Sequence, residues 1–275
     1  MLNLSAATIV LLGAAPCPRA ATFATMLQTE VYKRTAIRWS IGNSTAESAA
    51  ALGSAAAPTI TLSTRSAASV DWASATPEGY VLTTSASGGG GVSIVGADER
   101  GLLYGVGRLL RLTNMSLTEN YYDARRVSVS VAAGLRIASH PDRPMRGLQM
   151  GYRPKTNSYD GLTPELFEAY VVDLATFGAN QIELIPHSFD DAPYSPHFFL
   201  GHDEMNVAMS KTLDKYGLNV SLWYPACNPA LLGLGCPKGD YNNATVMAAA
   251  KADWHRVFSS SPRIEYKRIP ATVIP

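Results

Sequence analysis

The stretches FGANQIELIP (residues 177–186) and YGLNVSLWYP (residues 216–225) decide the fold. In each case a helical pattern is followed by a glycine, then by a run of mostly apolar residues, and finally by a proline. Glycine is the usual residue where a helix ends in the left-handed conformation, and a short apolar run is typical of a strand covered on both faces. The two stretches therefore predict a repeated helix–strand unit.

The flanking segments extend this repeat. Thr163 and Pro164 are typical of a helix start, and a second helix is predicted from Asp203. The predicted apolar faces of these helices consist of Leu166, Phe167, Tyr170, Val171, Leu174 and Phe177, and of Met205, Met209, Leu213 and Tyr216. A strand at 146–150 and a helix at 244–258 complete a βαβαβα series, whose right-handed crossovers make the strands parallel. We favour the start of a (β/α)8 barrel over a doubly wound sheet.

The length of this half is short for a barrel. A complete barrel takes ~250 residues, or ~31 for each unit, so residues 141–275 have room for about four units. Three strands are clear and a fourth is predicted at 263–266. Because a partial barrel leaves strand edges unpaired, we expect an incomplete version of a longer protein or a partner that closes the sheet.

Residues 1–140 predict a separate, smaller α/β domain with helices over a mixed sheet. Its second helix lies in GADERGLLYGVGRLLRL, where Asp98 is a good N-cap and the glycines inside the helix indicate close packing against the sheet. A dinucleotide site would need its glycines at a strand–helix turn instead. The other predicted elements are strands at 7–12 and 59–62, a helix at 20–35, and a hairpin of 80–84 and 92–95 joined by SASGGGG.

The composition of the chain argues against several classes of binding partner. Lys+Arg 23 against Asp+Glu 22 gives a formal charge of +1, which argues against nucleic acid. No apolar run approaches the ~20 residues of a membrane span. We expect no metal and no cofactor, because the histidines are scattered and no CxxC occurs. The sequence leaves the oligomeric state open.

Two features bear on localisation. Asn-x-Ser/Thr sequons at Asn3, Asn43, Asn114, Asn219 and Asn243 favour a secreted protein, without excluding the cytoplasm. The apolar run at 4–15 is compatible with a signal peptide, but no Lys or Arg precedes it, so we favour a first strand at 7–12.

Two motifs resemble a known group of enzymes. The helix ADERGLLYGVGRLLR (97–111) followed by RPMRGLQMGYRP (143–154) resembles the N-terminal part of glycoside hydrolases, in pattern the family 20 β-hexosaminidases and the family 67 α-glucuronidases. The resemblance extends over most of residues 6–266. It implies a β-hexosaminidase-like α/β domain before a barrel, and hydrolysis of O-glycosidic bonds in the full-length family.

The resemblance also implies roles for residues. Family 20 barrels place a substrate-binding arginine shortly after an Arg-Gly pair, and here Arg153 follows Arg146-Gly147 at an imperfect spacing. The family's catalytic acid lies near the end of the fourth strand, where this sequence reads KRIPATVIP. We therefore expect that no residue inherits that role, so that the chain lacks the catalytic acid.

Barrel enzymes work at the carboxyl ends of their strands, which selects a set of candidate substrate-binding residues. Arginine and aspartate can bind sugar hydroxyls, and aromatic rings can stack on sugars, although turn capping or core packing would also explain the acidic and aromatic members. The candidates are Arg153, Asp190, Asp191, Trp223 and Tyr224. Glu183, inside an apolar strand, is interpreted as an ion pair with Arg146 or as a substrate contact.

These observations support two functions. The first is a glycoside hydrolase-like protein of carbohydrate metabolism that supplies the accessory domain and the first barrel strands. The second is a non-catalytic carbohydrate-binding or structural remnant. A nucleotide-binding, doubly wound domain is disfavoured, because the sequence lacks the glycine-rich strand–helix turn that such a domain needs.

Overall fold

A computed structural model describes residues 1–12, 17–44, 57–64, 76–87, 90–116, 127–150, 162–184, 200–223, 244–261 and 264–268. The chain divides into two compact units. The first comprises Met1–Pro144 and Leu174–Gly178, and the second comprises Met145–Asp173 and Ala179–Pro275. The boundary predicted from the sequence lies between residues 140 and 141. Within the described residues, the first unit contains two sheets and the second contains one.

The first unit is built on a six-stranded mixed sheet of order β3-β2-β4-β6-β5-β9. The strands β3 (Ser40–Ser44), β2 (Thr8–Leu12), β4 (Thr59–Thr64) and β6 (Gly91–Gly96) are parallel, while β5 (Tyr80–Ser85) runs antiparallel to β6 and to β9 (Arg136–Ser139). A second sheet of three strands has the order β1-β8-β7, formed by Leu2–Asn3, Ser128–Val131 and Asn114–Ser116. The predicted hairpin of β5 and β6 is confirmed.

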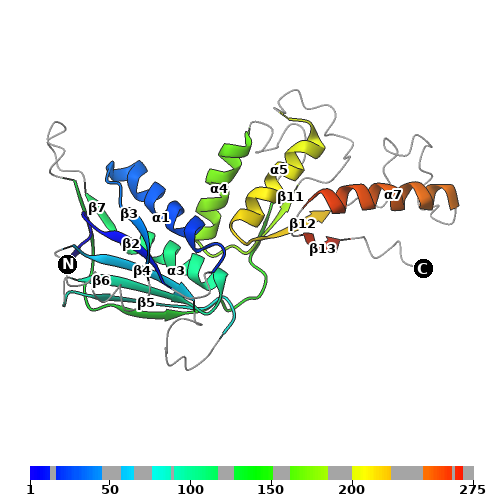
Figure 1. Cartoon of the computed structure of the whole chain (residues 1–275). Helices are drawn as coiled ribbons and strands as arrows, with labels where there is room; N and C mark the ends of the chain where they lie inside the picture. The colour runs from blue at the N-terminus through cyan, green and yellow to red at the C-terminus, as the bar shows by residue number, and fades with distance from the viewer. Residues whose placement is uncertain are drawn as a thin grey trace. The chain divides into compact units, whose positions relative to one another are not determined.

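Helices α1 (Ala20–Thr35) and α3 (Glu99–Leu112) pack on the larger sheet, on the same side of it in Figure 1. The strands alternate, so that Ile60, Leu62, Leu82 and Ile94 are fully buried in the core. The intervening row of Thr61, Thr83 and Ser93 is polar and half-buried, as the period of two in a strand requires. The core of this unit therefore lies between the sheet and its two helices.

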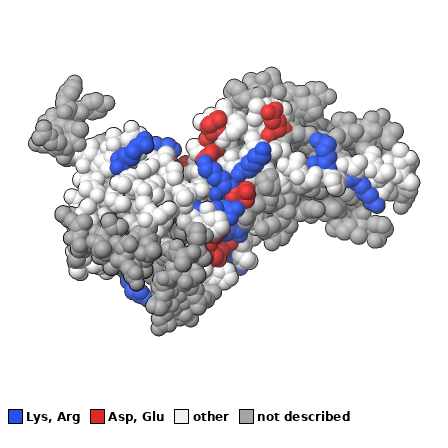
Figure 2. Space-filling model, viewed as in Figure 1, with Lys and Arg blue, Asp and Glu red and all other residues white. Residues whose placement is uncertain are grey.

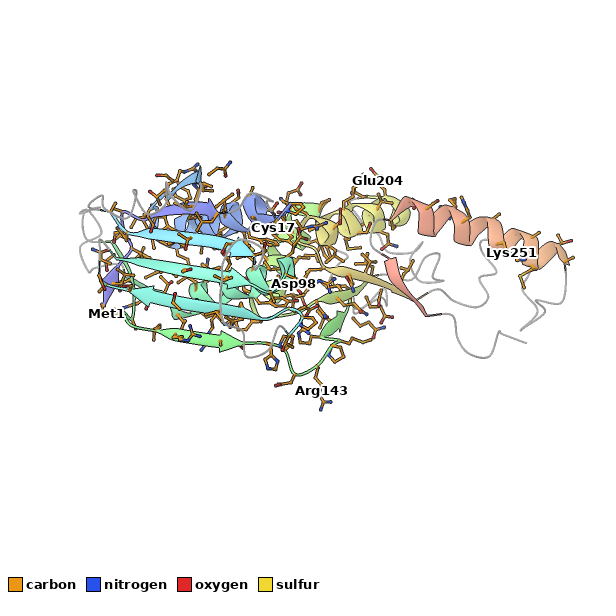
Figure 3. All side chains as sticks on the ribbon, turned by 60° about the horizontal axis from the view of Figure 1, so that its bottom comes forward. Met1, Cys17, Asp98, Arg143, Glu204 and Lys251 are labelled. Atoms are coloured by element: carbon orange, nitrogen blue, oxygen red, sulfur yellow. The ribbon has the colours of Figure 1, made fainter. Side chains whose placement is uncertain are left out.

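Helix α3 confirms two predictions from the sequence. The side chain of Asp98 (labelled in Figure 3) accepts a hydrogen bond of 2.8 Å from the backbone N–H of Gly101, as an N-cap does. A Cβ atom at Gly101 would collide with the carbonyl oxygen of Gly79, and one at Gly105 would collide with Ile94. These glycines let the helix approach the sheet.

The apolar run at the N-terminus contributes a strand to this sheet. Residues Thr8–Leu12 form β2, which is paired with β3 on one side and β4 on the other. The strand predicted at 7–12 is thus observed, and Ile9 and Val10 are buried in it.

The second unit holds a four-stranded parallel sheet in chain order. The strands are β10 (Gly147–Gln149), β11 (Gln181–Leu184), β12 (Asn219–Trp223) and β13 (Ile264–Arg268). Helices α4 (Pro164–Thr176), α5 (His202–Lys215) and α7 (Ala244–Ser260) follow the first three strands in turn (Figure 1). Right-handed crossovers that always step in one direction place their helices on one face of the sheet. The fold is therefore α/β, a mixed α/β unit followed by part of a (β/α)8 barrel.

The glycines of the repeat end their helices as predicted. Gly178 and Gly217 have φ angles of 93° and 72°, and their N–H groups bond to the carbonyls of Ala175 and Asp214, both at 3.0 Å. Only the left-handed region allows these turns, and glycine reaches it without the steric cost of a Cβ atom. The two helix ends thus lead directly into β11 and β12.

The predicted apolar face of α4 is partly wrong. Phe167 and Val171 are fully buried, but Leu166, Tyr170 and Phe177 are exposed to 52%, 37% and 77%. At about 100° per residue, Leu166 and Tyr170 lie along one stripe of the helix, turned away from the buried pair, and Phe177 follows the last residue of the helix. The apolar surface of α4 is therefore wider than the part that packs in the core.

Acidic side chains lie near the starts of helices α4 and α5 of the second unit. Glu165 lies in the first turn of α4, and Glu204 is exposed near the start of α5. Figure 2 shows acidic atoms over the outer ends of both helices. A negative charge at a helix N-terminus interacts favourably with the helix dipole.

Of the helices in the described ranges, none has the length and apolarity to cross a membrane.

Candidate functional site

Most of the predicted site residues lie outside the described residues. This applies to Arg153, Asp190, Asp191 and Tyr224. Trp223 is the last residue of β12, where its backbone is paired with Arg268 of β13. It therefore marks the carboxyl end of the sheet, the edge at which barrel enzymes place their functional groups.

The two faces of the second unit's sheet differ in chemistry. Ile182, Leu184, Val220 and Leu222 are at most 3% exposed and form the face toward the helices, where α5 packs on β11 and β12. Successive residues of a strand point to opposite faces. The opposite face, called the polar face below, is lined by Gln149, Gln181, Glu183 and Ser221.

The polar face holds two hydrogen-bonded pairs of side chains, one buried and the other more exposed. Gln181 and Ser221 are each 8% exposed, and the Gln181 side-chain amide donates a hydrogen bond to the Ser221 hydroxyl. In the row of paired residues that also includes Ser221, the exposed Gln149 donates from Nε2 to Oε1 of the half-buried Glu183 at 3.3 Å. Along this row the exposure therefore rises from Ser221 through Glu183 to Gln149 on the edge strand β10, and along β11 it rises from Gln181 to Glu183.

The partner of Glu183 differs from the one expected. An ion pair with Arg146 is one of the two roles expected from the sequence, but the Glu183 carboxylate is hydrogen-bonded to Gln149. The reason is the register, because Gln149 and Glu183 are directly opposed on β10 and β11. The backbone N–H of Arg146 instead donates to Oδ1 of Asn180 at 2.9 Å. The spacing of residues in the sequence does not show which residues of β10 and β11 are paired.

A carboxylate and an amide side by side can bind hydroxyl groups. The ionised carboxylate accepts hydrogen bonds at about four positions, and the amide both donates and accepts. Sugars present hydroxyl groups that match such a set. Within the part of the chain that the structure describes, no group of three or more His, Cys, Asp and Glu residues could hold a metal ion.

The first unit contains a cysteine that is unsuited to nucleophilic chemistry. Cys17 is half-buried, and its Sγ lies 3.6 Å from Oε1 of Glu99. Burial, with a further contribution from the negative charge of Glu99, raises the pKa of the Cys17 thiol to about 11. Because the thiolate is the reactive form, this side chain is unreactive at neutral pH. Glu99 is also paired with Arg19 at 2.6 Å, which ties the starts of α1 and α3 together.

Together, the two units define a class of protein: an α/β accessory unit joined to β/α repeats of the barrel type, with polar groups at the carboxyl ends of the strands. Residues 3–132 match a family model described as Glycosyl hydrolase family 20, domain 2. The chain is thus similar to the family 20 glycoside hydrolases, as its motifs predicted. The resemblance to family 67 is not among these findings and stays a prediction.

Solved structures share the fold along nearly the whole chain. An inactive mutant of the GH20 exo β-N-acetylglucosaminidase from Vibrio harveyi is 12% identical with a TM-score of 0.61, and the match covers 95% of this chain and 43% of that chain. CpGH84B is 16% identical with a TM-score of 0.56, covering 96% of this chain and 40% of its own. The chain therefore spans less than half the length of these neighbours. Curated proteins gave no match.

Proposed function

We propose that the chain is a glycoside hydrolase-like protein that binds carbohydrate at the carboxyl ends of β10–β13. The observation that carries the proposal is that the exposed Gln149 and the half-buried Glu183 lie together on the polar face, at or next to the carboxyl ends of β10 and β11. The match of residues 3–132 to the second domain of family 20 supports the choice of carbohydrate over other small molecules. Of the proposed substrate-binding residues, Trp223 ends β12, and Arg153, Asp190, Asp191 and Tyr224 follow these strands in the sequence.

We further propose that this chain binds sugar without hydrolysing it. Glycoside hydrolysis ordinarily uses two carboxyl groups, ~5–5.5 Å apart for retention or ~6.5–9.5 Å apart for inversion, unless the substrate supplies its own nucleophile. Among the described side chains of β10–β12, Glu183 is the one carboxylate on the polar face. The other carboxyl groups proposed for the site, Asp190 and Asp191, follow the same strand in the sequence, so these three residues do not supply a pair from two strands to flank a glycosidic bond.

A pair of assays on the full chain tests the proposal. Binding is measured by calorimetric titration with neutral oligosaccharides, including oligomers of N-acetylglucosamine, and turnover is measured with a panel of aryl glycosides. We expect saturable binding and no turnover above the blank. Turnover that is abolished by Glu183→Gln would contradict the second part of the proposal, and the absence of any sugar binding would contradict the first.

A structural remnant without ligand is the competing function. It predicts that no sugar in the panel binds, although cooperative unfolding shows that the full chain is folded. The calorimetric titration therefore separates the two functions directly.

A further inference from the structure

We infer that Gln149 and Glu183 form one binding element for two adjacent hydroxyl groups of a neutral sugar ring. The inference rests on the proposed function and names the residues that would carry it in the described part of the sheet.

The backbone fixes the two side chains relative to each other. Gln149 and Glu183 are opposed in the parallel register of β10 and β11, and the N–H of Met150 donates to the carbonyl of Glu183 at 3.0 Å. Both side chains consequently leave the sheet on the same face. Sites built on strands hold their groups more precisely than sites built on loops.

The pair retains hydrogen-bonding capacity. Within the described residues, the Glu183 carboxylate accepts one hydrogen bond, at Oε1 from Gln149. Its second oxygen, the amide oxygen of Gln149 and the second amide hydrogen remain available to a ligand. Two acceptors and a donor within one hydrogen-bonded pair are the complement of two neighbouring hydroxyl groups.

The neighbouring pair shows what a purely structural arrangement looks like on this face. Gln181 and Ser221 are buried and hydrogen-bonded to each other, as buried polar groups must be. Gln149 and Glu183 are more exposed, so their hydrogen bond replaces contacts with water and contributes little to folding. Their chemistry is therefore available for binding.

The ligand class follows from charge. A carboxylate repels phosphorylated or acidic sugars but accepts strong hydrogen bonds from neutral hydroxyls, which are shortened by its charge. An amide beside it adds a directional contact without adding charge. The element fits a neutral sugar better than an acidic one.

The test compares single-residue variants of the full chain in calorimetric titrations with the neutral oligosaccharides that the unmodified chain binds. Glu183→Gln and Gln149→Ala are the test variants. Glu204→Gln is the matched control, because Glu204 is an exposed carboxylate of the same unit on α5 (Figure 3). Circular dichroism and thermal unfolding establish that all three variants keep the fold.

We expect Glu183→Gln to weaken binding about tenfold, Gln149→Ala to weaken it several-fold, and Glu204→Gln to leave it unchanged. If the unmodified chain binds sugar and Glu183→Gln binds equally well, the inference is wrong while the proposed function stands. If the unmodified chain binds no sugar, both are wrong. Stronger binding of acidic than of neutral sugars would also overturn the inference.

Discussion

Glu30 shows how one side chain makes the stability of the first unit depend on pH. It lies in α1 with its side chain 8% exposed, and it accepts hydrogen bonds from Lys33 at 2.8 Å and from Arg34 at 2.5 Å. Burial acts to raise the pKa of Glu30, but the hydrogen bonds and charges of Lys33 and Arg34 outweigh it and hold the pKa below its usual value. The charged form is therefore stabilised by folding.

The sign of the pH dependence follows. A lowered pKa in the folded state contributes stability above the unfolded-state pKa of about 4.3, and this contribution is lost as the pH falls through the folded-state pKa. We expect Glu30→Gln to lower the free energy of unfolding at neutral pH and to have little effect in strong acid. Urea unfolding at several pH values measures the difference, and a gap that grows toward acid would contradict the assignment.

Gly105 tests the close approach of α3 to the sheet. Alanine would favour the helix by about 1 kcal/mol, but its Cβ atom would collide with Ile94, which is fully buried. Overpacking of this kind costs about 1–3 kcal/mol, so we expect Gly105→Ala to lower the free energy of unfolding.

The matched control for Gly105 is Gly42→Ala. A Cβ atom at Gly42, in the edge strand β3, would meet nothing within 4 Å. We expect a change within about 0.5 kcal/mol in denaturant unfolding. Equal effects of the two substitutions would show that the helix and the sheet are not in the close contact described.

At the scale of elements, Asp98 fixes the start of α3. Its carboxylate accepts from the N–H of Gly101 and from the N–H of Glu78, both at 2.8 Å. Loss of an N-cap costs about 1–2 kcal/mol. We expect Asp98→Ala to lower the free energy of unfolding by that amount, and Asp98→Asn to lower it less, because asparagine keeps one acceptor oxygen.

The control for this series is Asp142→Ala, which removes an exposed carboxylate from the same unit. Denaturant unfolding should leave this variant close to the unmodified chain. An Asp98→Ala variant as stable as Asp142→Ala would show that the cap does not hold α3.

The sequence predicted those elements whose local signals are strong. The helix expected at 20–35 is observed as Ala20–Thr35. At the start of α4, the hydroxyl oxygen of Thr163 accepts a hydrogen bond of 3.3 Å from the backbone N–H of Leu166. The edge strand Ser40–Ser44, with the sequence SIGNS, was missed. It has no apolar alternation and is a strand because β2 pairs with it, a contact that local sequence does not encode.

The candidate site was less predictable, for the same reason. The choice of the carboxyl edge followed from the β/α repeat, but the pairing of Gln149 with Glu183 depends on the register between strands that are 34 residues apart. An alternative with Arg146 was equally compatible with the sequence. Register is set by backbone hydrogen bonds and by the packing of Ile182 and Leu148 on the opposite side, which spacing alone does not reveal.

At the scale of the molecule, the first unit supports the similarity to family 20 and the second supports the barrel interpretation. The first has a mixed sheet with two helices on it, and its residues account for the family 20 domain match. The second has parallel strands in chain order without a reversal of direction. A doubly wound sheet binds its ligand at such a reversal, so this order supports the barrel interpretation and disfavours the nucleotide-binding alternative.

The most direct test of the central claim is to map sugar binding by NMR on the full chain with assigned backbone amides. We predict that a neutral oligosaccharide shifts the amides near the carboxyl ends of the strands, at Gln149, Leu184 and Trp223. The amides at their amino ends, Gln181 and Asn219, should not move. Shifts confined to the amino ends or to the first unit would contradict the account.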